Sequence, residues 1–94
     1  MIYSCITGDN TLLFFKNRSQ MASISFKSEL NLLNYLKMCI FNKNKKFNDL
    51  LNESNIIFST LTKYDIYYIN LNYDNIYNDF YNHIKQIERG DFYT

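Results

Sequence analysis

The single histidine of this 94-residue chain, His83, is the side chain best suited to acid–base chemistry near neutral pH. Asp79 stands four residues earlier, so on a helix its carboxylate would lie one turn away and could orient the imidazole. Such a pair is half of a general-base arrangement, but local sequence ties no serine or cysteine nucleophile to it. We therefore expect His83 to lie on the flank of a helix without a catalytic role. A small hydrolase or nuclease centred on His83 is the least favoured of three functional hypotheses.

Two cysteines, Cys5 and Cys39, are the other reactive side chains. Both stand inside apolar segments, which is typical of buried, reduced thiols rather than of a disulfide or a nucleophile. The sequence contains neither a CxxC pair nor a glycine-rich phosphate-binding pattern, and no ligand cluster at metal-binding spacing is visible. We expect no metal and no cofactor.

The densest charge lies in and just before the Asn- and Lys-rich stretch at residues 42–46. The lysines concerned are Lys37, Lys43, Lys45 and Lys46. Phe41 and Phe47 flank the stretch, and lysines beside aromatic rings can bind phosphates and stack on bases. The formal net charge of the chain is only +1, which does not indicate a strong polyanion binder. Nucleic-acid binding through residues 37–46 is therefore the alternative hypothesis, and a solvated loop between two helices is the simpler interpretation.

Tyrosine is concentrated in the C-terminal half of a chain that contains nine tyrosines in all. Residues 66–71 (IYYINL) alternate in a way that predicts a strand, with the odd-numbered side chains facing the core and Tyr68 on the outer face. Tyrosine combines a large apolar area with a polar tip and is enriched at protein interfaces. We therefore expect a protein-binding surface that contains Tyr68, Tyr64 in the preceding turn, and Tyr81 on the last helix.

Hydrophobic periodicity predicts the elements that would position these side chains. Alternating or short apolar segments, flanked by turn residues, predict strands over residues 1–7, 11–16, 21–26, 55–61 and 66–71. Apolar stripes at spacings of three and four predict helices over residues 28–41 and 45–53, and a last helix from Asp74 to Gly90. The predicted fold class is therefore α+β, in the order β-β-β-α-α-β-β-α, as one compact domain over residues 1–94. A small, mainly antiparallel sheet would carry the helices on one face.

The composition of the chain limits the classes of protein to which it could belong. Pro and Trp are absent, Gly occurs twice, and Asn, Ile, Lys, Tyr and Phe dominate, a bias that follows A/T-rich codons rather than chemistry. Neither a signal-peptide pattern nor an apolar run of membrane-spanning length is present, so we expect a soluble cytoplasmic protein. Our leading hypothesis is a non-enzymatic module that binds a partner protein or a second copy of itself. Such small proteins are common among phage and mobile-element accessory proteins, including anti-CRISPR-like inhibitors of host defence that occupy a partner surface.

Overall fold

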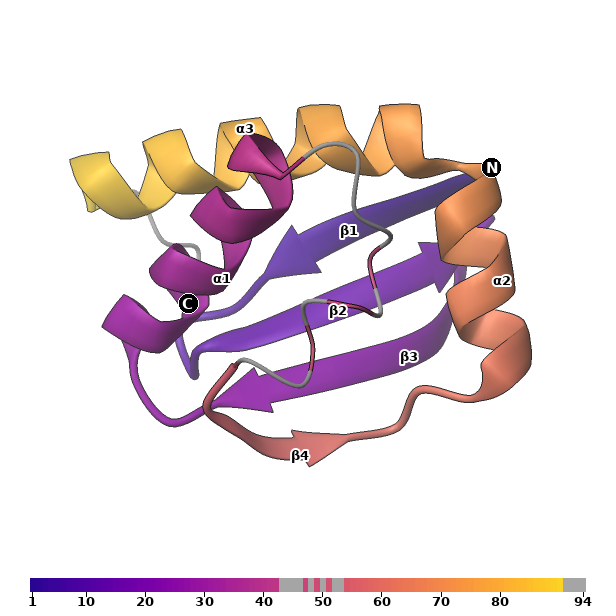
Figure 1. Cartoon of the computed structure of the whole chain (residues 1–94), viewed down its shortest axis with the longest axis horizontal. Coiled ribbons are helices and arrows are strands. Elements are labelled where there is room, and N and C mark those ends of the chain that lie inside the picture. Colours follow the sequence, from indigo (N-terminus) through magenta and orange to yellow (C-terminus); the bar gives the residue numbers. More distant parts are fainter. Residues whose placement is uncertain (43–46, 48, 50, 52–53, 91–94) are drawn as a thin grey trace.

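Four strands and three helices make up the part of the chain that the computed structural model describes, which is residues 1–42, 47, 49, 51 and 54–90. The elements are β1 (Ile2–Ile6), β2 (Thr11–Lys16), β3 (Ser19–Phe26), α1 (Glu29–Phe41), β4 (Ile56–Ser59), α2 (Lys63–Leu71) and α3 (Tyr73–Arg89). The strands form one antiparallel sheet in the order β1-β2-β3-β4 (Figure 1). The predicted α+β class and antiparallel sheet are confirmed.

The first three strands are consecutive hairpins whose turns need an unusual backbone conformation. Asn10 and Asn17 lie in the two turns with φ angles of 61° and 58°. Asparagine enters this left-handed region at a lower cost than most other residues that carry a side chain. The strands then alternate, so that Leu12 and Phe14 of β2 and Ile24 of β3 are all fully buried on one face of the sheet.

Helices α1 and α3 pack against this buried face, as the single apolar stripe of each predicts (Figure 1). The Ser28 hydroxyl caps α1 by accepting the Asn31 N–H at 3.1 Å. Gly90 ends α3 with a φ of 72°, a left-handed conformation that glycine adopts without strain. The largest fully buried side chains between the layers are Tyr35, Phe14, Phe26, Phe47 and Phe80. The bulkiest side chains of an otherwise mainly aliphatic core are therefore aromatic.

The segment expected as a fifth strand, residues 66–71, is instead the main part of helix α2. Thr62 Oγ1 accepts the Asp65 N–H at 3.2 Å, and the Asp65 carboxylate accepts the Thr62 N–H at 2.9 Å. This reciprocal cap satisfies two backbone donors and begins a helix at Lys63. The periodicity of so short an aromatic segment is compatible with a strand and with a helix. Here the reciprocal cap at Thr62 favours the helix. Among the described residues the sheet therefore has four strands rather than five.

The helix expected over residues 45–53 lies largely outside the described residues. Phe47 belongs to the described part and is fully buried, with its ring 5.4 Å from that of Phe14 in an edge-to-face arrangement. Its backbone N–H donates to Asn70 Oδ1 of α2 at 3.1 Å. Phe47 thus links the sheet core to α2.

Truncating a core anchor of either long helix should destabilise the protein strongly. Leu36 of α1 and Phe80 of α3 are fully buried. Leu36→Ala and Phe80→Ala should each lower the free energy of unfolding by about 2–5 kcal/mol, because apolar burial is lost and a cavity remains. Chemical denaturation followed by circular dichroism measures the change. Leu30→Ala, on the exposed side of α1, is the matched control and should stay within about 0.5 kcal/mol of the wild type. Unchanged stability of both core variants would contradict the assignment of the helix faces.

Candidate protein-binding surfaces

Helix α2 exposes four large side chains along one side. Tyr64, Tyr67, Tyr68 and Leu71 follow the spacing i, i+3, i+4, i+7 and are 77%, 59%, 38% and 63% exposed. On a helix these positions share one side, away from the buried Ile69. We call the four residues the α2 stripe. Large exposed apolar and aromatic side chains that lie together are a mark of an interaction site.

Contacts with the rest of the protein hold the α2 stripe in place. Lys16 Nζ of β2 lies 4.1 Å from the centre of the Tyr68 ring, a cation–π contact. The Tyr67 and Tyr68 rings meet edge to face at 5.6 Å. The reciprocal cap at Thr62 fixes the first turn of the helix, and Asn70 accepts the Phe47 N–H near its last turn. A surface that is ordered before binding loses less conformational entropy when a partner binds.

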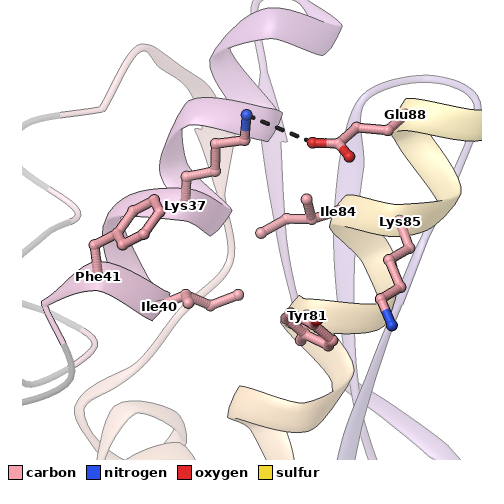
Figure 2. Close-up of a pocket in the computed structure, with 7 residues that line it drawn as sticks. All are labelled: Lys37, Ile40, Phe41, Tyr81, Ile84, Lys85 and Glu88. Carbon is pink, nitrogen blue, oxygen red and sulfur yellow. Dashed lines mark ion pairs between the residues drawn. The ribbon is translucent and has the colours of Figure 1, made fainter.

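A second exposed surface is the groove between α1 and α3, which Figure 2 shows. Its cavity volume is about 380 Å³, and it is lined by Lys37, Ile40, Phe41, Tyr81, Ile84, Lys85 and Glu88. We call it the α1–α3 groove. Ile40 and Ile84 point toward each other between the two helices (Figure 2), whereas Phe41 is 81% exposed at the end of α1. The floor of the groove is therefore apolar, and a large aromatic side chain stands at its mouth.

The charges of the α1–α3 groove lie on its rim. Lys37 Nζ is 3.6 Å from Glu88 Oε1, and both side chains are substantially exposed, so water screens this ion pair and it contributes little stability. Lys85 Nζ lies 4.4 Å from the centre of the Tyr81 ring. Two lysines and one glutamate give the rim a positive balance, which would attract an anionic group.

A cluster of polar side chains joins α3 to β1. Asp79 Oδ2 accepts the Ser4 backbone N–H at 2.7 Å. His83 Nε2 lies 3.0 Å from Ser4 Oγ, and His83 Nδ1 lies 3.2 Å from Gln86 Oε1. Because an amide oxygen only accepts, this assignment of Gln86 places the ring proton on Nδ1. Nε2 is then an acceptor, and at 3.0 Å it is a closer acceptor for the single Ser4 hydroxyl proton than Asp79 Oδ2 at 3.4 Å.

The hydroxyl, imidazole and amide of this cluster stand in the order of a nucleophile, a base and the group that orients the base. Ser4 is only 5% exposed, however. The neighbouring pocket of about 340 Å³ is lined by Cys5, Ile6, His83 and Gln86, so a substrate there would reach the imidazole but not the Ser4 hydroxyl. The contact between Ser4 and His83 spans 79 sequence positions, and no local pattern could have indicated it.

Removal from water shifts the pKa values of the histidine and of both thiols, and for Cys5 partial burial and then the charge of Asp79 raise the pKa. Removal from water lowers the pKa of His83 below its ordinary 6.5, and the hydrogen bond to Gln86 and the charge of Asp79 oppose this only in part. Burial raises the pKa of the Cys39 thiol to about 12, so that thiol is a poor nucleophile near neutral pH. Cys5 was expected to be buried as well and is exposed, because strand alternation turns it away from its buried neighbour Ser4.

The site residues expected from the sequence fall on two surfaces. Tyr64 and Tyr68 lie together on α2, rather than in a turn and on the outer face of a strand. Tyr81 lies on α3 in the α1–α3 groove, which also contains Lys37 of the nucleic-acid hypothesis. The remaining lysines of that hypothesis, Lys43, Lys45 and Lys46, lie outside the described residues. The structure therefore brings Tyr81 and Lys37 together and separates both from the tyrosines of α2.

Two members of the α2 stripe, Tyr67 and Leu71, were expected in the core because a strand would have turned them inward. Their spacing of three and seven residues from Tyr64 was the signal that could have identified them. Phe41 and Lys85 could not be found in this way, because only the packing of α1 beside α3 gives them a shared surface.

Comparisons with known proteins give no further lead, since no family model, no curated protein and no solved structure matches the chain. Within the described residues, no three His, Cys, Asp or Glu side chains gather as metal ligands would. None of the helices in this part of the chain has the length and apolar character needed to cross a membrane.

Acidification should weaken the packing of α3 through His83. Its pKa is lowered by folding, so between that lowered value and 6.5 the unfolded state binds more protons and stability falls as the pH falls. Above pH 6.5 this contribution is fully present. The thermal midpoint of the wild type, measured from about pH 8 to about pH 5, should therefore fall more than that of His83→Gln, which cannot titrate there. Parallel curves for the two proteins would contradict a lowered His83 pKa.

The two thiols should react very differently in the native protein. Cys5 is exposed and should be labelled by an alkylating reagent within minutes, whereas Cys39 should react only after unfolding. Mass spectrometry of the time course would count one added group and then two. Cys5→Ser removes the fast step without touching the core, and a fast step that survived in this variant would show that Cys39 is accessible.

Proposed function

We propose that this protein is a non-enzymatic protein-binding module and that the α2 stripe is its contact surface. The observation that carries the proposal is the exposure of four large side chains at helical spacing on one short helix. Tyrosine side chains bring large contact area at a modest entropic cost, and they are frequent energetic centres of protein interfaces.

The geometry of the α2 stripe supports insertion into a groove of the partner. A helix of nine residues is about 13 Å long, enough for two turns of contact. Side chains at i, i+3, i+4 and i+7 are the anchors that a helix uses when its apolar face lies in a hydrophobic groove. The cap at Thr62 and the contact between Lys16 and Tyr68 order the helix in advance.

The rival hypotheses have weaker support. Of the four lysines of the nucleic-acid hypothesis, only Lys37 belongs to the described residues, and Glu88 stands beside it. The enzyme hypothesis gains Ser4 as a neighbour of His83, but the hydroxyl lies under the surface. A role as a phage or mobile-element inhibitor of host defence, and a cytoplasmic location, rest on composition and sequence pattern alone and stay predictions.

Polar substitutions in the α2 stripe should abolish partner binding and leave the fold intact. Tyr64→Ser and Tyr67→Ser remove the two most exposed rings, and serine has about the same helix propensity as tyrosine. A buried tyrosine anchor contributes about 2 kcal/mol or more, so the dissociation constant should rise roughly 30-fold or more. Affinity capture from the native host identifies the partner, and calorimetry with the purified pair then measures the constant.

Leu30→Ser is the matched control, because it removes an exposed apolar side chain from a different helix. It should bind as the wild type does. Circular dichroism and the thermal midpoint verify that all variants are folded. If sedimentation of the wild type depends on concentration and the double substitution abolishes this dependence, the partner is a second copy. If the folded double variant binds as tightly as the wild type, the α2 stripe is not the contact surface. If the wild type binds neither a partner protein nor a second copy, the protein is not a binding module and the proposal is wrong.

A further inference from the structure

The α1–α3 groove has a chemistry that the α2 stripe does not share. Its interior is mainly apolar and is formed by Ile40, Ile84 and the Tyr81 ring, while the charged groups stand at the rim (Figure 2). A mostly apolar site with a few placed polar groups gains affinity from the apolar part and orientation from the polar part. Such a site favours a ligand that is itself amphipathic.

The rim specifies an acidic ligand. Lys37 and Glu88 form the one ion pair within the described ranges, and no described carboxylate lies within ion-pair distance of Lys85. Lys85 holds its ammonium group against the Tyr81 ring instead. An incoming carboxylate would therefore pair with Lys85 without breaking an ion pair, and it could compete with Glu88 for Lys37. A polyphosphate strand along the same rim would meet the negative charge of Glu88.

The shape of the α1–α3 groove favours a protein segment over a small amphiphile. The groove is open on its solvent side between the two helices (Figure 2), whereas small ligands usually lie in pockets that enclose about 70–90% of their surface. In helix-in-groove complexes, an amphipathic helix binds in the groove between two packed helices. Phe41, at the mouth of the groove, would add aromatic contact area to such a segment.

We propose that the α1–α3 groove binds an acidic amphipathic segment of a partner protein. A large apolar side chain of this segment lies over Ile40 and Ile84, and an Asp or Glu beside it pairs with Lys85. The site is separate from the α2 stripe, so each proposal can fail without the other.

A random peptide display library, selected on the immobilised full-length protein, tests the proposal without knowledge of the partner. The enriched peptides should combine a large apolar residue with Asp or Glu within one helical turn. Their dissociation constants, measured by fluorescence anisotropy, should rise about tenfold or more for Lys85→Glu and for Ile84→Ser. Higher salt should weaken binding to the wild type and have little effect on the residual binding to Lys85→Glu.

Lys27→Glu is the matched control, because it makes the same charge change on an exposed loop residue outside the groove. It should bind the selected peptides as the wild type does, and so should the protein with Tyr64→Ser and Tyr67→Ser. Circular dichroism confirms the fold of each variant. The proposal is overturned if no peptide is enriched, if enriched peptides lack acidic residues, or if Lys85→Glu binds them normally. It is overturned equally if a single-stranded oligonucleotide or dodecanoate, but no peptide, binds in a way that depends on Lys85.

Discussion

Helix α3 is held beside β1 by core packing through Ile76 and Phe80 and by one short hydrogen bond, from the Ser4 backbone N–H to Asp79 at 2.7 Å. β1 is an edge strand, and an edge strand carries backbone groups with no neighbouring strand to bind them. A carboxylate acceptor makes a stronger hydrogen bond than a neutral group, so the contact fixes α3 beside β1 firmly. The outer side of α3 is then free to form the α1–α3 groove with α1 (Figures 1 and 2).

The opposite edge of the sheet is protected in a different way. β4 is only four residues long, and its pairing with β3 shifts register between Ser25 and Phe26. Short edge strands and local irregularities of this kind make it harder for another chain to add a strand. Ile57 and Phe58 nevertheless remain exposed there. One edge is thus closed by a helix and the other is shortened and irregular, and neither edge is a surface that we propose for binding.

Burial of its own side chains contributes little to the stability of helix α2. Ile69 is its one fully buried residue, and its helical form relies on the cap at Thr62 and on the hydrogen bond between Asn70 and Phe47. Tyr64, Tyr67 and Leu71 are largely exposed to water and add little to the core, whereas Tyr68 contributes its contact with Lys16. Binding of a partner would give these side chains the burial that the fold does not provide.

Local signals in the sequence determined much of this protein. The turns at Asn10 and Asn17, the cap at Ser28 and the glycine at the end of α3 act over a few residues, and the long helices show an unambiguous spacing of three and four. The same reasoning failed over residues 66–71, where six residues are too few to separate the two periods. The spacing of Thr62 and Asp65, which form the reciprocal cap, is also visible in the sequence and correctly indicates the start of a helix.

Only the tertiary structure decided which side chains share a site. Ser4 contacts His83 across 79 positions, and Lys37 and Tyr81 line the same α1–α3 groove although they belong to different helices. Periodicity states which side of an element is apolar, but it carries no information about which other element lies against that side. That choice comes from the packing of the whole core, where α3 is held at the β1 edge and α1 lies beside it. The α1–α3 groove is therefore a product of packing, whereas the α2 stripe and most of the helices and strands follow from the local sequence.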